Sequence, residues 1–180
     1  MTRAATDLTA VVITASDRSA AGERPDTSGE LVAERLAGLG FRVERSIVPD
    51  DRTIIERSLI DAAAANRLVV TTGGTGLTPR DVTPQATAAV VDYEVPGLAE
   101  AMRAEGRRHT PMASLSRGIV GVRGGTLIVN LPGSPRAALE SFEVIAPVLG
   151  HAMETLAGPF DHAAHAGRPD LPPGDSEPTR

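Results

Sequence analysis

The chain has 180 residues, of which 41% are hydrophobic, and this is enough for one domain with a single substantial core. It contains no cysteine, which excludes disulfides, thiolate metal ligands and a cysteine nucleophile and suits a reducing compartment. A net charge of −5 with 2% aromatic residues excludes the basic, stacking surface of a general nucleic-acid binder. Without an apolar run near the ~20 residues of a membrane span, we expect a cytoplasmic protein with no membrane or nucleic-acid partner.

The first predicted elements are a strand and a helix. Residues 1–7 form an N-terminal extension, and the β-branched apolar run Leu8 to Ala15 predicts a buried strand because it is too short for a helix. Thr27 and Glu30 have the spacing of a capping box, which predicts the start of a helix that Gly40 ends.

The same order of elements is then repeated. Residues 41–48 predict a second strand, and Thr53 with Glu56 forms another capping box that opens a second helix. Residues 68–72 predict a third strand, which runs directly into the glycine-rich segment 73–76.

Among the last predicted elements, two helices have a proline close to their start. Thr83-Pro84 and Ser134-Pro135 each place a proline at the first helical position, where a missing amide costs nothing. We predict helices from Thr83, from Pro96 to Gly106 and from Ser134 to about Leu156, with a strand over Thr126 to Asn130. The single domain therefore covers residues 8–157, and the polar composition of residues 158–180 predicts a disordered tail.

Strands that alternate with helices at these spacings predict an α/β fold, with a mostly parallel sheet covered by helices on both faces. In such sheets, ligands bind beyond the carboxyl ends of the strands, where the strand order reverses. Unusual chemistry does follow the predicted strands, in Thr14–Arg18, Pro49–Asp51, Thr72–Gly76 with Pro79–Asp81, and Asn130–Ser134. We therefore expect the site at this edge of the sheet.

The glycine-rich segment has the properties of a phosphate-binding loop. Gly73, Gly74 and Gly76 let the backbone turn its amides inward, and the helix predicted from Thr83 points its positive end the same way. A simple tight turn is the alternative. The segment matches neither the Walker A pattern nor the dinucleotide fingerprint, which disfavours an ordinary kinase, GTPase or dehydrogenase.

Acidic residues at these loops are suited to Mg²⁺, which proteins bind through one or two carboxylates together with substrate phosphates. The candidates are Asp81 and either Asp50 or Asp51, with Asp17 as a third member or as part of a capped turn. Taken alone, each aspartate is explained more simply by turn formation or capping. Their convergence on one glycine-rich loop favours a metal and phosphate site.

A hydroxyl-rich segment, Ser114-Leu115-Ser116-Arg117, precedes a predicted short strand. Its hydroxyls and guanidinium suit a ligand phosphate or the edge of a pterin ring, and the alternative is a solvated loop.

Together these segments resemble the Mog/MoaB family, which includes molybdopterin adenylyltransferases and the matching domain of gephyrin. The resemblance extends from about Leu8 to Ala157, and the glycine-rich loop joined to Pro-Arg-Asp-Val-Thr-Pro is its most specific part. The motifs that carry it are Thr72–Gly76, Pro79–Pro84, Leu115–Arg117 and Asn130–Pro135.

The resemblance implies a three-layer α/β/α fold like that of molybdopterin-binding domains, usually assembled as a homotrimer. It implies that AMP is transferred from Mg-ATP to the terminal phosphate of molybdopterin, with release of pyrophosphate, during molybdenum cofactor biosynthesis. The implied cofactor is Mg²⁺, ATP and molybdopterin are the substrates, and a molybdate-insertion enzyme is a further expected partner.

The resemblance also implies roles for particular residues. Asp50 and Asp81 are the expected catalytic and metal-binding residues, and Ser116 is associated with molybdopterin. Gln85 departs from the pattern, since many relatives carry an acid there, and we expect a modest effect on the helix dipole. The full set expected to bind cofactor or substrate is Ser16, Asp17, Gly73, Gly74, Thr75, Gly76, Ser116, Arg117, Pro132, Gly133 and Ser134.

Three other functions are compatible with this fold. A non-catalytic paralogue that binds pterin or nucleotide, or acts as a scaffold, is the chief alternative, and the presence of Asp50 and Asp81 favours the enzyme. A nucleotide pyrophosphate hydrolase or a molybdate-inserting enzyme is disfavoured, because such proteins are usually longer and carry further domains.

Overall fold

The structure is a computed structural model that describes residues 8–158, so the predicted extension and nearly all of the predicted tail lie outside the described residues. The elements are β1 (Thr9–Ala15), α1 (Asp17–Ala20), α2 (Thr27–Gly38), β2 (Arg42–Val48), α3 (Arg52–Ala65), β3 (Leu68–Thr72), α4 (Thr83–Val90), β4 (Tyr93–Glu94), α5 (Pro96–His109), the 3₁₀ helix η1 (Pro111–Leu115), β5 (Val120–Arg123), β6 (Thr126–Leu131) and α6 (Pro135–Ala157). Within residues 8–158, no helix combines the length and the apolar character needed to cross a bilayer.

The six strands form one sheet in the order β2-β1-β3-β6-β5-β4. The first four strands in this order are parallel, and β5 and β4 add an antiparallel edge. This confirms the prediction of a mostly parallel sheet. The chain passes from β1 to β2 on one side and then to β3 on the other, so the strand order reverses between β1 and β3. The carboxyl ends of these two strands are therefore where a ligand site is expected.

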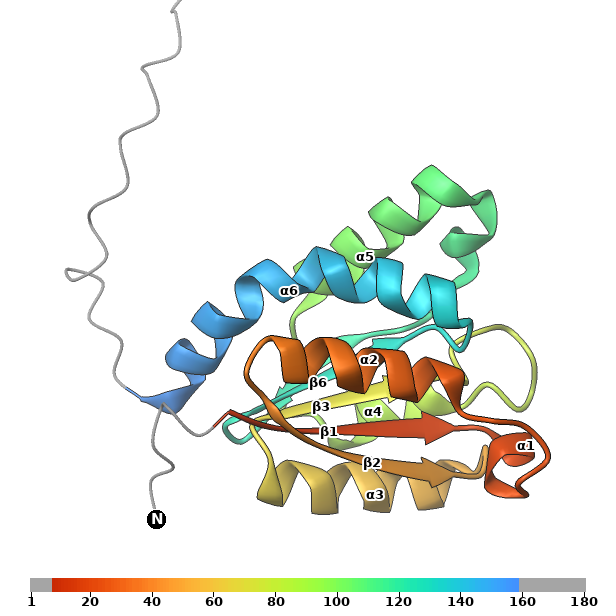
Figure 1. The fold of residues 1–180 in the computed structure, drawn as a ribbon, viewed down its shortest axis with the longest axis horizontal. Coiled ribbons are helices and arrows are strands. Elements are labelled where there is room, and N and C mark those ends of the chain that lie inside the picture. Colours follow the sequence, from red (N-terminus) through yellow and green to blue (C-terminus); the bar gives the residue numbers. More distant parts are fainter. Residues whose placement is uncertain (1–7, 159–180) are drawn as a thin grey trace, which may run out of the picture.

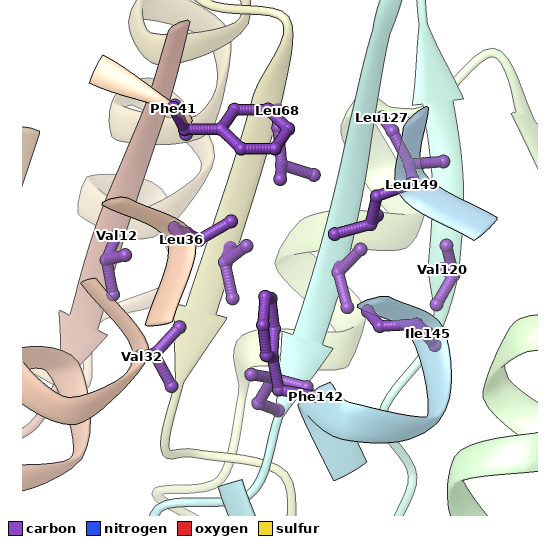
Figure 2. Close-up of a cluster of buried hydrophobic side chains, with 14 of the residues drawn as sticks. Val12, Val32, Leu36, Phe41, Leu68, Val120, Leu127, Phe142, Ile145 and Leu149 are labelled. Atoms are coloured by element: carbon purple, nitrogen blue, oxygen red, sulfur yellow. The ribbon is translucent and has the colours of Figure 1, made fainter. Parts of the chain in front are cut away.

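Helices cover both faces of the sheet, which confirms the predicted three-layer α/β/α class (Figure 1). Successive strand residues point to opposite faces, so Val12 contributes to one core and Val11 to the other. The larger core lies under α2, α5 and α6, where Leu36 and Phe142 pack onto the sheet (Figure 2). The smaller core lies under α3 and α4. Because both faces are buried, the central strands read as unbroken apolar runs.

The starts of α2 and α3 differ from prediction by one or two residues. The capping-box pattern placed the N-caps at Thr27 and Thr53, but the caps are Asp26 and Asp51. Each aspartate accepts a hydrogen bond from the amide three residues further on, at 2.9 Å and 3.0 Å. Aspartate is a strong cap because its carboxylate also interacts with the positive end of the helix, so the upstream aspartate replaces the threonine.

The proline-marked starts of α4 and α6 are confirmed as helix starts, but neither hydroxyl serves as a cap. Thr83 lies inside α4, with Val82 at the N-cap position, and the side chain of Ser134 makes no capping hydrogen bond to α6. The short elements α1 and β4 were not predicted, because four and two residues are too few to show a periodic pattern.

Candidate active site

The glycine-rich loop after β3 lies between the ends of β1 and β6. The Gly73 amide donates a hydrogen bond to the carbonyl of Leu131 at 3.2 Å. A Cβ at Gly73 would lie only 2.4 Å from the carbonyl oxygen of Ala15, and the backbone there has a φ of +91°. Only glycine fits both constraints. The loop is therefore held against the two strand ends that flank the point where the strand order reverses.

The start of α4 closes onto this loop. The Thr83 amide donates to the carbonyl of Gly74 at 3.2 Å. A Cβ at Gly74 would lie 2.3 Å from Oγ1 of Thr83 and 3.6 Å from Oδ1 of Asp50. The Thr83 side chain is fully buried, and among residues 8–158 its Oγ1 is the buried side-chain oxygen without a hydrogen-bond partner. A buried hydroxyl without a hydrogen-bond partner costs free energy, so it marks a position where the hydroxyl would donate a hydrogen bond to a ligand oxygen.

Asp17 and Asp50 join the loops after β1 and β2. The Asp17 amide donates to Oδ2 of Asp50, and the Asp50 amide donates to Oδ1 of Asp17, each at 2.9 Å. Arg80 donates to the remaining oxygen of Asp17, and this hydrogen bond holds the pKa of Asp17 below its usual value. Asp51 caps α3 instead. Of the two neighbouring aspartates, Asp50 is therefore the one whose carboxylate reaches the glycine-rich loop.

Asp81 approaches the loop from the other side. Its Oδ2 accepts the Thr78 amide at 2.8 Å and lies 3.0 Å from the position that a Cβ of Gly76 would take. Partial burial alone would raise the pKa of Asp81, but hydrogen bonds from Thr78 and Gly76 together with the charge of Arg117 outweigh burial and lower it. The carboxylate is thus ionised and fixed at neutral pH.

Arg117 secures the backbone of the same loop. Its guanidinium donates to the carbonyls of Gly76, at 2.6 Å, and of Asp81, and its amide donates to the carbonyl of Thr75 at 2.9 Å. The sequence suggested a direct contact between Arg117 and a ligand. In the structure, the guanidinium donates to backbone oxygens on either side of Arg80, so Arg117 positions this loop, and its contact with a ligand stays a prediction.

A largely apolar cavity of about 280 Å³ opens beside the loop, between α5, η1 and α6. Thr75, Gly76, Ser116 and Pro132 line the side that faces the strand ends. The opposite walls carry Ala99, Met102, Met112, Ala113, Leu115 and Ala137. Arg103 and Glu140 also line the cavity, and mainly apolar walls with a small number of polar groups are typical of a small-molecule site. Sequence reasoning missed these apolar walls, because nothing in the sequence indicates how α5 and α6 approach each other.

The other predicted residues lie at the same edge of the sheet. Ser16 Oγ caps α1 by accepting the Ser19 amide at 3.2 Å. A Cβ at Gly133 would lie 3.1 Å from Cα of Gly73, so the loop after β6 packs closely on the glycine-rich loop. Ser134 follows at the start of α6. Every loop singled out from the sequence is therefore brought to one end of the sheet.

Buried hydrogen bonds hold the strand ends beneath the site. Thr14 Oγ1 donates to Asp26 at 2.9 Å and lies 3.0 Å from Oγ1 of Thr72, while Arg45 pairs with Asp26 at 3.0 Å. On the other face, Asn130 Nδ2 donates to the hydroxyls of Thr71 and Thr87, at 3.0 Å and 2.9 Å. Sequence reasoning missed this support. Its only signal was the change from apolar residues to threonine and asparagine at the strand ends.

Whether this site suits Mg²⁺ depends on the donor atoms that its residues offer. Over residues 8–158 there is no group of three or more His, Cys, Asp or Glu side chains that would hold a metal without help. Two carboxylates instead approach the glycine-rich loop, Asp50 at Gly74 beside the unpartnered Thr83 hydroxyl and Asp81 at Gly76. This donor set fits Mg²⁺, which commonly takes one or two carboxylates and completes its shell with water and phosphate oxygens.

The comparison with known proteins covers most of the chain. Residues 11–151 match the MoCF_biosynth family model, described as "Probable molybdopterin binding domain". A molybdopterin adenylyltransferase of Helicobacter pylori (strain J99) is 40% identical over 156 residues, 83% of this chain and 88% of that protein.

Solved structures agree with this match. The molybdopterin biosynthesis enzyme MoaB of Thermus thermophilus is 50% identical, with a TM-score of 0.79 over 84% of this chain and 98% of its own. The molybdopterin biosynthesis Mog protein of Mycobacterium ulcerans is 43% identical, with a TM-score of 0.80 over 83% of this chain and 99% of its own. With most of its length matched in sequence and in structure, the chain belongs to the MoCF_biosynth family.

Proposed function

We propose that this protein is a molybdopterin adenylyltransferase, which transfers AMP from ATP to the terminal phosphate of molybdopterin in molybdenum cofactor biosynthesis. The observation that carries the proposal is the approach of Asp50 and Asp81 to a glycine-rich loop, against which α4 places the unpartnered hydroxyl of Thr83. A matched relative that covers most of the chain is named for this activity. The retained carboxylates favour an enzyme over a non-catalytic binding protein.

The reaction requires alignment of two phosphates and no covalent enzyme intermediate. A terminal phosphate oxygen of molybdopterin attacks the α-phosphorus of ATP, and the bond from that phosphorus to the oxygen bridging to the β-phosphate breaks. The electron pair leaves with pyrophosphate, and a new phosphate anhydride joins molybdopterin to AMP. Catalysis of this kind depends on positioning and charge stabilisation, so no side chain of the site has to act as a nucleophile.

The loops supply the phosphate-binding groups in this proposal. Within the loop 73–76, the amides of Gly73 and Gly76 are engaged by Leu131 and Asp81, so the amides of Gly74 and Thr75, together with the N-terminus of α4, hold the ATP phosphates. The apolar cavity beside the loop takes the pterin, with Ser116 at its polar end. Arg117 keeps the loop in the conformation that serves both ligands. The remaining rim residues, Ser16, Asp17, Pro132, Gly133 and Ser134, bound the space between the two substrates.

Asp50 and Asp81 would hold Mg²⁺ in the proposed site, with Thr83 Oγ1 available to a ligand oxygen nearby. When bound, the ion neutralises negative charge on the phosphate oxygens. The two carboxylates also fix the geometry of the loops after β2 and β3, because Asp50 accepts the Asp17 amide and Asp81 accepts the Thr78 amide.

The test is to incubate purified protein with Mg-ATP and molybdopterin, and to measure pyrophosphate and adenylylated molybdopterin. Asp81→Asn keeps an oxygen that can accept the Thr78 amide but loses the charge, so we expect turnover to fall about 10²-fold while the fold is retained. Asp50→Asn should lower turnover to a similar extent. Asp92→Asn is the matched control, because Asp92 also accepts a backbone amide, from Gly124 at 2.7 Å, but lies at the opposite end of the sheet.

Two results would contradict the proposal. Unchanged turnover in Asp81→Asn would remove the role of this carboxylate. Tight binding of molybdopterin by the wild-type protein without formation of any product would identify a non-catalytic paralogue instead.

A further inference from the structure

Arg80 is an exposed cation at the edge of the site. The side chain is 63% exposed, yet its Nη2 and Nε lie 2.5 Å and 3.1 Å from Oδ2 of Asp17. Asp17 begins α1, which follows β1, and Arg80 belongs to the loop after β3, so the pair bridges the position where the strand order reverses.

The backbone around Arg80 is fixed, although its side chain is exposed. The Asp81 amide donates to the carbonyl of Thr78 at 3.0 Å, and the Thr78 amide donates back to the Asp81 carboxylate at 2.8 Å. Arg117 holds the carbonyls of Gly76 and Asp81. The guanidinium therefore extends from a rigid turn, and it can change partner without any movement of the main chain.

The charges of three carboxylates act on this guanidinium, and Asp17 is the one that hydrogen-bonds it. The hydrogen bond and the charge of Asp17 raise the pKa of Arg80, and the charges of Asp50 and Asp51 add to the effect. The local charge is therefore negative in the absence of ligand, and a nucleotide triphosphate would be repelled unless a cation faced it.

Arginine is the available source of that cation, because all 18 basic residues of the chain are arginines. Three other arginines at this edge have structural partners. The guanidinium of Arg117 donates to backbone carbonyls, and Arg45 pairs with the buried carboxylate of Asp26. Arg24 donates to Oγ of Ser16. Arg80 differs from these, because its partner is a half-exposed carboxylate.

We propose that Arg80 is a phosphate-binding residue. Without nucleotide its guanidinium is paired with Asp17, and it moves from Asp17 to the nucleotide phosphates when the nucleotide binds. The inference rests on the proposed function, because that function supplies the nucleotide. An exposed ion pair contributes little, so its loss costs little, whereas an arginine hydrogen bond to phosphate is among the stronger polar contacts. The exchange also frees Oδ2 of Asp17 for a divalent cation.

The experiment measures ATP affinity by calorimetry in EDTA, so that no metal contributes. It compares the wild type with Arg80→Gln, Arg80→Lys and Asp17→Asn. The asparagine can still accept the Asp50 amide, so this variant removes the charge and keeps the loop contact. Arg35→Gln is the matched control, because Arg35 is also exposed and ion-paired, to Glu143 at 2.5 Å, but it joins α2 to α6.

If Arg80 binds phosphate, Arg80→Gln and Asp17→Asn should change the affinity for ATP in opposite directions. Arg80→Gln should weaken ATP binding at least about tenfold, with partial recovery in Arg80→Lys. Asp17→Asn should tighten ATP binding by up to about fivefold, because the guanidinium no longer has to leave a partner. Without nucleotide, Mn²⁺ measured by electron paramagnetic resonance should bind Arg80→Gln about fivefold more tightly than wild type. Arg35→Gln should match the wild type in both measurements.

Equal weakening in Arg80→Gln and Asp17→Asn would overturn the inference, because it would show that the ion pair acts only as a structural clamp. Failure of the inference is distinguishable from failure of the proposed function. If the opposite shifts occur but no adenylylated pterin forms, Arg80 keeps its role and the transferase activity is refuted. If product forms while ATP binds wild type and Arg80→Gln equally, the activity stands and the role of Arg80 is refuted.

Discussion

Gly73 contributes to the site by having no side chain. We expect Gly73→Ala to destabilise the fold and weaken ATP binding, because a Cβ there would meet the Ala15 carbonyl at 2.4 Å in a backbone of φ +91°. Gly124→Ala is the control, since Gly124 has a φ of +55° but no atom within 4 Å of an added Cβ. Urea denaturation should show Gly73→Ala to be less stable than the control by about 1–3 kcal/mol. Equal losses would mean that the close approach is unimportant.

Asp81 gives the site a pH dependence. Its pKa is lowered in the folded protein, so its ionised form stabilises the native state. That contribution is complete above the unfolded pKa of about 3.9 and is lost as the pH falls through the lower folded value. We therefore expect Asp81→Asn to have a lower urea midpoint than wild type at pH 7, and the difference to shrink below about pH 4. A difference that stays constant with pH would contradict this account.

Among the secondary-structure elements, two helices are capped by aspartates that differ in burial. The Asp26 side chain is 2% exposed, accepts hydrogen bonds from Gly29 and Thr14 and pairs with Arg45. Asp51 is exposed, and its side chain accepts the capping hydrogen bond from the Ile54 amide.

Replacing each cap by alanine separates these contributions. Asp51→Ala should cost about 0.5–2 kcal/mol of unfolding free energy, which is typical of a helix cap. Asp26→Ala should cost about 3–5 kcal/mol, because it also leaves buried donors without their carboxylate. Chemical denaturation followed by circular dichroism measures both values. If Asp26→Ala costs no more than Asp51→Ala, the buried network adds nothing to the cap.

Over the molecule as a whole, several large apolar side chains remain more than a third exposed, among them Ile47, Ile54, Tyr93 and Val148. Assembly would remove such surface from water. The family resemblance implies a homotrimer, so light scattering coupled to size exclusion should give about three times the chain mass of 18.7 kDa. A mass of one chain at micromolar concentration would contradict this expectation.

The order of elements could be predicted because each central strand is an unbroken apolar run and each main helix has a start signal. The predicted helix starts were less accurate. Thr27 and Thr53 fit the capping pattern, but the neighbouring aspartates form the caps, because sequence spacing does not show which side chain reaches the amide. The strand β4 could not be predicted, since its pairing with β5 depends on a contact between distant segments.

The fold class, the family resemblance and the loops that make the site all follow from the sequence, because parallel strands with intervening helices must bring their carboxyl ends to one edge. Which atoms meet at that edge depends on tertiary packing. Packing separated Asp50 from the cap Asp51, left the Thr83 hydroxyl without a partner, and placed Arg80 on Asp17. These contacts join residues up to 63 positions apart, and their distances depend on side-chain direction, which local sequence patterns do not encode.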